Sequence, residues 1–128
     1  MIYLSYDELL ALHVYLMRDL MGETYYGVLQ EALLRSALAR PQHAAQYEKA
    51  SAIRQAEYLF QGLLMNHGFA QGNKRTAYLA LEWFINRNDL GELHASDREI
   101  VQMCLNAENK KWTVAQIETW LRKHLRAA

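Results

Sequence analysis

Three helix-start signals of one kind recur along this chain, and they constrain its fold class more than any other feature. Ser5, Ser96 and Thr113 are each followed three residues later by Glu or Gln, the pattern of a capping box. In such a box the hydroxyl accepts a hydrogen bond from an amide of the first turn, and the later side chain bonds back to the cap. Apolar residues at helical spacing follow each box, so the chain is predicted to begin helices at these three places.

The middle of the chain shows the same helical period. Apolar residues recur at helical spacing over residues 28–37, and Pro41 predicts the end of that helix, because its ring disfavours helical backbone at Arg40. A long helix is predicted over residues 47–66. Another is predicted over residues 73–88, which are apolar on most sides and therefore belong at the centre of the core.

The remaining segments carry signals for breaks rather than for strands. Ile2–Leu4 is the one candidate for a short edge strand, and residues 23–26 are read as an irregular flap. No repeat, linker or second domain is found, so residues 1–128 are predicted to form one all-α domain, a compact bundle of about six helices. The predicted breaks are residues 22–27, 40–44, 68–72, 89–95 and 109–112.

Composition excludes several classes of protein. The chain has 14 basic and 14 acidic residues, so it lacks the positive field expected of a protein that binds nucleic acid or an anionic membrane. Its one cysteine, Cys104, excludes an internal disulfide and a cysteine-based zinc site. No apolar run reaches the roughly 18 residues of a membrane span. The first residues also lack the basic segment of a signal peptide, so we expect a cytoplasmic protein.

One polar stretch, residues 66–77, stands between the two most apolar predicted helices. Gly72 allows a tight bend, and the free amides of the helix that follows it form a site suited to an anion. Lys74 and Arg75 in the first turn oppose the helix dipole, which a bound phosphate chain would relieve. His67 precedes the bend and has the chemistry to accept a proton from a hydroxyl that attacks such a phosphate.

This stretch is not a Walker A loop. That loop requires four residues between its glycines, then Lys and Ser or Thr, and it follows a strand. Here Gly68 and Gly72 are separated by three residues, Asn73 stands before Lys74, and a helix precedes.

The sequence His-Gly-Phe-Ala-Gln-Gly-Asn-Lys-Arg at residues 67–75 resembles the motif of the Fic/Doc family, His-x-Phe-x-Asp/Glu-Gly/Ala-Asn-Gly/Lys-Arg. Because position 74 is lysine rather than glycine, the motif is most similar to that of the death-on-curing (Doc) toxins. Residues 3–13 and 33–42 are also similar to segments of Doc-type proteins, so the resemblance covers nearly the whole chain.

The resemblance implies a fold, a mechanism and site residues. The fold would be the all-α Fic/Doc fold, with His67 as the general base and Phe69 as a buried anchor of the loop. The residues implied to bind nucleotide phosphates are Gly72, Asn73, Lys74 and Arg75. Arginine offers phosphate a bidentate fork and lysine a compact charge, as phosphoryl transfer requires.

The resemblance also implies cofactors and partners. Doc toxins transfer the γ-phosphate of ATP to a threonine of elongation factor Tu, halt translation, and are held in check by a small antitoxin, Phd. Fic proteins with glycine at the position of Lys74 transfer AMP instead. Both use Mg²⁺. We therefore expect ATP, Mg²⁺, elongation factor Tu and a Phd-type antitoxin, with no direct nucleic-acid partner.

Position 71 departs from the family pattern, which has an acidic residue there to hold Mg²⁺. Gln71 brings no negative charge, and hard cations prefer carboxylates. Three readings stay open: the nucleotide holds the metal, another carboxylate such as Glu57 or Glu82 helps, or turnover is weakened and the chain acts as a binding module. Gly68, which replaces the Pro or Ile common after the histidine, is expected to loosen the loop.

Several of these residues also have simpler, purely structural interpretations. Asn73 can serve only as a helix cap, Arg75 as a structural ion-pair partner, and Gln71 as an ordinary loop residue. His13 is expected to be a hydrogen-bonded core histidine, and Cys104 a small buried residue. Three other histidines are expected at the surface: His43, His94 and His124. The three tryptophans are expected to pack between helices: Trp83, Trp112 and Trp120. Tyr25 and Tyr26 either plug the core or form a flap that docks a target or an antitoxin.

Overall fold

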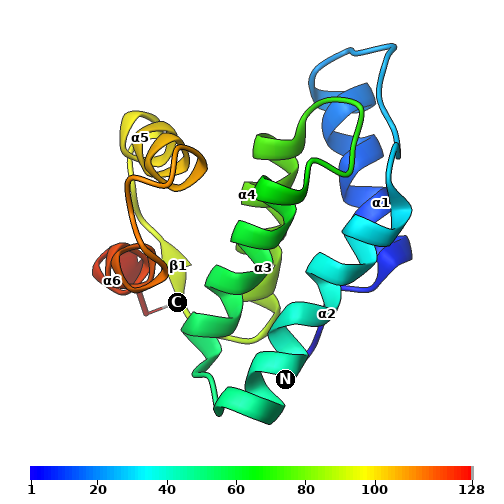
Figure 1. Ribbon diagram of the computed structural model, residues 1–128. Coiled ribbons are helices and arrows are strands. Elements are labelled where there is room, and N and C mark those ends of the chain that lie inside the picture. The colour runs from blue at the N-terminus through cyan, green and yellow to red at the C-terminus, as the bar shows by residue number, and fades with distance from the viewer. Residues whose placement is uncertain (128) are drawn as a thin grey trace.

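Helices make up most of the chain in this computed structural model, which describes residues 1–127 (Figure 1). The elements follow the order α1 (Tyr6–Val14), a π-helical segment η1 (Tyr15–Leu20), α2 (Glu31–Glu48), α3 (Ala52–Asn66), α4 (Asn73–Arg87), β1 (Glu92–Leu93), α5 (Asp97–Glu108), α6 (Val114–His124) and β2 (Leu125–Arg126). The predicted all-α fold is confirmed. Within the described residues, no helix has both the length and the apolar character needed to cross a bilayer.

All three predicted capping boxes are present. The Ser5 hydroxyl accepts from the amide of Glu8, and the Glu8 carboxylate accepts from the amide of Ser5. Ser96 and Thr113 form the same reciprocal pair of bonds at the starts of α5 and α6. Local sequence therefore sets where α1, α5 and α6 begin.

The prediction that a helix ends before Pro41 is wrong. Helix α2 runs through Pro41 to Glu48, although the proline leaves the carbonyl of Ala37 without its usual helical donor. Packing accounts for this, because a Cβ built on Gly62 of α3 would lie 3.0 Å from the Cβ of Ala37. This close approach of α2 and α3, together with the burial of Pro41, outweighs the local cost of the proline.

The break that was predicted at residues 40–44 lies further along the chain. Lys49 ends α2 with φ at 52°, in the left-handed region. The Ser51 hydroxyl then accepts from the amide of Arg54 and caps α3, so the helix predicted from residue 47 begins at Ala52. The helix predicted over residues 73–88 is found at Asn73–Arg87.

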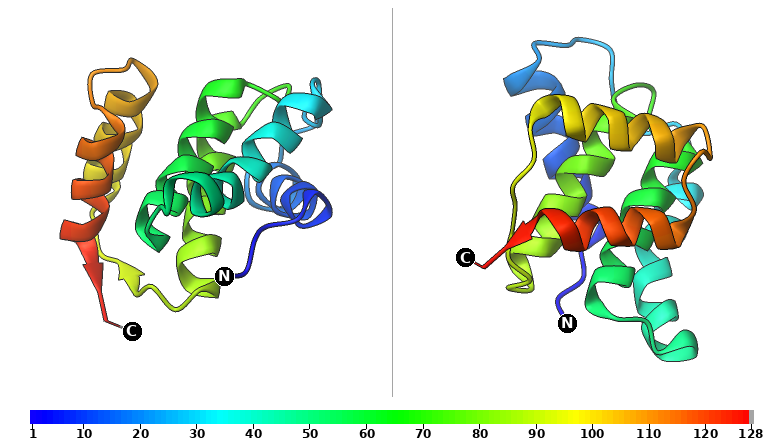
Figure 2. Two further views of the ribbon diagram at one scale, coloured as in Figure 1. Left: turned by 60° about the horizontal axis from the view of Figure 1, so that its bottom comes forward. Right: turned by 90° about the vertical axis from the view of Figure 1, so that its left-hand side faces the viewer.

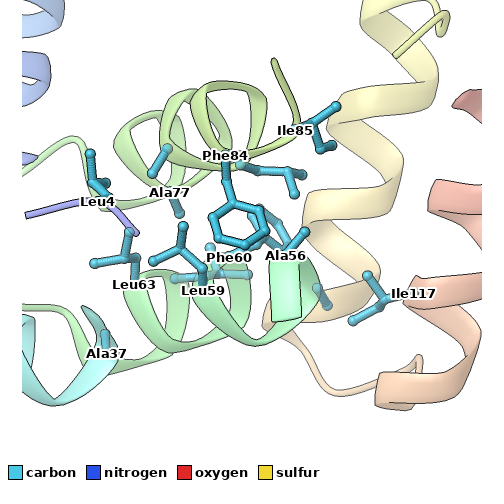
Figure 3. Close-up of a cluster of buried hydrophobic side chains, with 14 of the residues drawn as sticks. Leu4, Ala37, Ala56, Leu59, Phe60, Leu63, Ala77, Phe84, Ile85 and Ile117 are labelled. Carbon is cyan, nitrogen blue, oxygen red and sulfur yellow. The ribbon is translucent and has the colours of Figure 1, made fainter. Parts of the chain in front are cut away.

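The core lies mainly between α3 and α4. Phe60 of α3 and Phe84 of α4 are fully buried and face each other there (Figure 3). Leu4, Ala37 and Ile117 bring the N-terminal segment, α2 and α6 to the same cluster. The predicted central position of α4 is confirmed, since its buried residues are Thr76, Ala77, Ala80, Leu81, Phe84 and Ile85.

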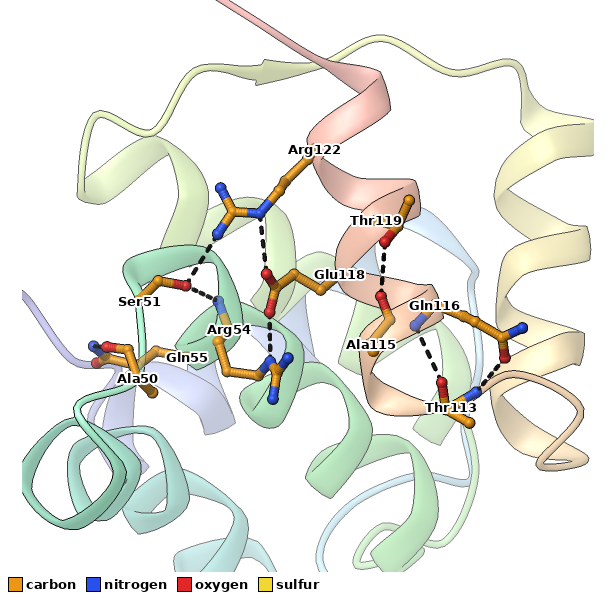
Figure 4. A network of polar contacts seen from close by, with 10 residues as sticks. All are labelled: Ala50, Ser51, Arg54, Gln55, Thr113, Ala115, Gln116, Glu118, Thr119 and Arg122. Atoms are coloured by element: carbon orange, nitrogen blue, oxygen red, sulfur yellow. Dashed lines mark hydrogen bonds and ion pairs between the residues drawn. The ribbon is translucent and has the colours of Figure 1, made fainter.

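Helices α5 and α6 form a second layer that crosses the α3–α4 pair (Figure 2). A polar network fastens α6 to the start of α3 (Figure 4). Glu118 accepts from Arg54 through one carboxylate oxygen and from Arg122 through the other, and Arg122 also donates to the Ser51 hydroxyl. Because both arginines meet one carboxylate, this layer has a defined orientation on α3.

The predicted edge strand at Ile2–Leu4 is not formed. The side-chain amide of Asn88 accepts from the Ile2 amide at 2.6 Å and donates to the Ile2 carbonyl at 2.9 Å, so a side chain replaces a neighbouring strand. The two short strands lie elsewhere: β1 and β2 pair antiparallel, with Glu92 opposite Arg126.

The prediction that His124 lies at the surface is also wrong. It is buried, stacks on Trp120 and lies 3.0 Å from the Glu99 carboxylate of α5. Cys104 is buried as predicted, and burial raises the pKa of its thiol to about 11. The three tryptophans pack against the core as predicted.

Glu57 of α3 is a carboxyl group buried in the core without a hydrogen-bond partner among the described residues. Its side chain is fully buried, and neither carboxylate oxygen has a hydrogen-bond partner within residues 1–127. Burial raises the pKa of Glu57 to about 8, so the folded protein holds this group as a neutral acid at neutral pH. Glu57 lies outside the lining of the pocket described below, which removes it as a helper at position 71.

Replacing Glu57 with Gln is expected to flatten the pH dependence of stability. The folded pKa lies above the unfolded value of 4.5, so the free energy of unfolding falls as pH rises from about 4.5 to 8 and levels off above. Glu57→Gln should be more stable than the wild type at pH 9, by up to about 5 kcal/mol. Urea unfolding at pH 5, 7 and 9 measures this. The exposed Glu48→Gln variant is the control. If the free energy of unfolding of Glu57→Gln fell with pH as steeply as that of the wild type, the raised pKa of Glu57 would be contradicted.

Candidate functional site

The loop between α3 and α4, residues 67–72, is called the motif loop here. His67 ends α3 with φ at 50°, and Gly72 precedes α4 with φ at 76°, so both ends of the loop turn in the left-handed region. A Cβ on Gly72 would lie 2.4 Å from the Sδ of Met17. Glycine is therefore favoured at position 72 both by the backbone angle and by the close approach of η1.

The segment between η1 and α2, residues 21–30, is called the flap, and it pairs with the motif loop. The amides of Leu29 and Gln30 both donate to the carbonyl of Gly68, at 2.9 and 3.0 Å, and the amide of Ala70 donates to the carbonyl of Gly27 at 2.8 Å. In Figure 1 the two connections lie at the same end of the molecule. The irregular flap predicted at residues 23–26 is confirmed as a segment without regular structure.

Gly68 has a packing role that the sequence did not predict. It is buried, and a Cβ at this position would lie 2.3 Å from the Cδ2 of Leu34 in α2. Its carbonyl accepts both flap hydrogen bonds. The missing side chain thus permits close packing of the loop against α2.

His13 joins four parts of the site, and its prediction as a hydrogen-bonded core histidine is confirmed. Its ring stacks on Phe69 of the motif loop with centroids 3.7 Å apart. Nε2 accepts from the amide of Gly27, so Nδ1 carries the proton and donates to the hydroxyl of Thr76 in α4. Burial lowers the pKa of His13 to about 4, which keeps the ring neutral and this tautomer in place.

Asn73, predicted to bind phosphate or to serve as a helix cap, has a structural task that differs from the cap. Gly72 occupies the cap position, and the Asn73 side chain makes two bonds to the backbone of Phe69. The Phe69 amide donates to Oδ1 and Nδ2 donates to the Phe69 carbonyl, both at 3.0 Å. Phe69 itself is buried beneath the loop, so Asn73 and His13 together fix the loop conformation.

A cavity of about 370 Å³, called the motif pocket, lies over the start of α4. It brings together six of the seven predicted site residues, all except the buried Phe69. The lining residues are Met17, Met21, Leu64, His67, Gln71, Gly72, Asn73, Lys74, Arg75 and Glu108.

The charges around this pocket favour an anion, with one exception. Helix α4 has no acidic residue in its first turn and no capping side chain, so the positive end of its dipole faces the pocket unopposed. Arg75 is exposed there, with Nη1 3.4 Å from the sulfur of Met21. The exception is Glu108 from the end of α5, whose Oε2 lies 2.9 Å from the Nζ of Lys74.

The surroundings of Gln71 do not fit a metal ion held by the protein. Gln71 Nε2 donates to the Glu23 carboxylate at 3.3 Å and to the carbonyl of Tyr25. The one carboxylate in the pocket lining, Glu108, is paired with Lys74. Within residues 1–127 no group of three His, Cys, Asp or Glu residues is arranged to hold a metal. Glu82 faces a neighbouring groove and not this pocket.

Comparison with known proteins agrees with this geometry. The sequence model of the Fic/DOC family matches residues 3–85, more than half of the chain. The chain belongs to the Fic/DOC family. Members of this family are generally transferases of phosphorus-containing groups. A search of curated proteins finds no match.

The site of this Fic/DOC protein includes residues that its sequence did not reveal. Glu108 enters from the second helical layer, and Met17 and Met21 enter from η1 and the flap. Spacing gave no signal for Glu108, because its partner Lys74 lies 34 positions away on another helix. The sequence predicts Glu23 only as part of the flap, because its bond to Gln71 depends on how the flap folds back.

Replacing Glu108 with Gln is expected to strengthen anion binding in the motif pocket. The change leaves the Lys74 ammonium free to meet an anion, and because both side chains are over a third exposed, the gain should be about two- to fivefold in affinity. Calorimetric titration with inorganic triphosphate measures it. The Glu92→Gln variant, in β1, is the control. Equal affinities for Glu108→Gln and wild type would contradict a role for Lys74 in anion binding.

Proposed function

We propose that this Fic/DOC protein is a Doc-like toxin that transfers the γ-phosphate of ATP to a Ser or Thr hydroxyl of elongation factor Tu and so blocks translation. One observation carries the proposal: His67 lies on the lining of the same pocket as Lys74, Arg75 and the unopposed N-terminus of α4. A base and an anion site in one cavity are the two parts that transfer of a phosphoryl group to a hydroxyl requires.

The step assigns one task to each group. His67 accepts the proton of the target hydroxyl, and the oxygen attacks the γ-phosphorus as the bond to the bridging oxygen of ADP breaks. The amides at the start of α4 and the side chains of Lys74 and Arg75 hold the phosphate oxygens. The Asn73 side chain acts through the loop, because both of its ends are bonded to Phe69.

Transfer of phosphate is favoured over transfer of AMP by the residue at position 74. The resemblance associates glycine there with AMP transfer and lysine with phosphate transfer. Lys74 places a side chain and a cation at the start of α4, where glycine would leave open space. Transfer of AMP is the second candidate, and the mass of the product separates the two.

A neutralising partner is part of the proposal. We propose a small antitoxin of the Phd type that binds beside the motif pocket. The flap offers exposed apolar surface next to that pocket, with Tyr25 66% and Leu29 63% exposed. Both residues adjoin the backbone that pairs with the motif loop, so a partner bound there would also control access to His67.

Incubation with ATP, MgCl₂ and elongation factor Tu is expected to add about 80 Da to the factor, the mass of one phosphoryl group. Intact mass spectrometry reads the product. His67→Ala should reduce the rate by at least about 100-fold, since it removes the general base. His94→Ala, an exposed histidine far along the chain, is the control. An adduct with the mass of AMP would overturn phosphate transfer, and no adduct from the wild type would contradict the proposed function.

A non-catalytic binding module is the alternative that Gln71 favours, because its amide is engaged with the flap. In that case the wild type gives no adduct, and Gln71→Asp gives one by restoring the acidic residue of the family motif. The same mass measurement with both proteins decides this. An active wild type excludes the binding module.

A further inference from the structure

We propose that Gln71 is a positioning residue that latches the flap onto the motif loop, and that this task replaces the binding of a metal ion at position 71. The latch consists of the Gln71 side-chain amide, the Glu23 carboxylate and the backbone carbonyl of Tyr25. It goes beyond the proposed function, because it concerns how the site is covered and does not depend on which group is transferred.

The chemistry of the two partners fixes the orientation of the amide. Nε2 of Gln71 lies 3.3 Å from the Glu23 carboxylate and within hydrogen-bonding distance of the Tyr25 carbonyl. Both partners are acceptors, so they require a donor between them, and a primary amide nitrogen supplies two hydrogens.

The latch acts in residues 24–26, where the other contact is the Tyr26 ring, packed edge-on against His13 with centroids 6.0 Å apart. The ends of the flap are fixed, because the Glu23 amide donates to the Met17 carbonyl and residues 27–30 pair with the motif loop. Within residues 1–127, the only hydrogen bond that reaches residues 24–26 is the one from Gln71 to the Tyr25 carbonyl. The side chain of Tyr25 is 66% exposed and adds little packing.

A carboxylate at position 71 is incompatible with this arrangement. It would set a second negative charge against Glu23 and an acceptor against the Tyr25 carbonyl, so both bonds would be lost and the charges would repel. Glutamine at position 71 is thus matched to glutamate at position 23. This pairing gives a physical reason for the departure of the chain from its family motif.

Limited proteolysis with chymotrypsin tests the latch without any nucleotide, so its result is separate from that of the proposed function. Tyr25 lies in the flap, and Tyr47, at the end of α2 and 76% exposed, is the internal reference. Intact mass spectrometry follows the ratio of cleavage after Tyr25 to cleavage after Tyr47 under native conditions. Local opening limits such cleavage, so the ratio reports the population of the open flap.

The expected result is a graded rise in this ratio. Gln71→Ala should raise it about tenfold, as for the loss of two hydrogen bonds, and Gln71→Glu should raise it further by repulsion. Combining Gln71→Glu with Glu23→Gln restores an amide–carboxylate pair with the roles exchanged, and should lower the ratio below that of Gln71→Glu alone. Gln61→Ala, which removes an amide from the middle of α3, should leave the ratio unchanged.

Two results would overturn the latch. One is a ratio in Gln71→Ala within twofold of the wild type. The other is a double variant whose ratio is as high as that of Gln71→Glu. If a single variant unfolds and both tyrosines are cleaved faster, the double variant decides by whether the ratio returns toward the wild-type value.

Discussion

The site depends on one neutral imidazole held inside the protein. His13 stacks on Phe69, accepts from the Gly27 amide and donates to Thr76, so α1, the flap, the motif loop and α4 meet on one ring. Each nitrogen has a fixed role only while the ring is neutral, and its burial keeps it so because the lowered pKa opposes protonation. The loop that presents His67 and Gly72 thus takes its shape from a residue more than fifty positions earlier in the chain.

The motif pocket is built from both layers of the fold. The first layer supplies the start of α4 with Lys74 and Arg75, and His67 at the end of α3. The second layer supplies Glu108, which is paired with Lys74 across the pocket. A phosphate bound there, as proposed, would compete with a carboxylate of the chain itself for Lys74. Of the two basic side chains in the pocket lining, Arg75 is the one without an ion pair within residues 1–127.

Local signals were sufficient for part of this structure. The three capping boxes and the helical spacing of apolar residues located α1, α5, α6 and the central α4, and the nine-residue motif located the pocket. Errors arose where a distant contact outweighed a local preference. Pro41 stays within α2 because of the packing against α3, Asn88 replaces a strand partner for Ile2, and His124 is buried against Trp120 and near Glu99 of α5. Glu108 and Glu23 were missed as site residues for the same reason, since only the folded chain brings them to Lys74 and Gln71.

The ion pair between Lys74 and Glu108 joins the part of the chain that the family model matches to a helix outside it. The family match ends at residue 85, and α5 with Glu108 lies beyond it. The pairing of Lys74 can therefore be altered by substitutions in a helix that contributes no residue to the motif loop. Related chains can thus differ in how strongly this pocket attracts anions while they keep the same motif loop.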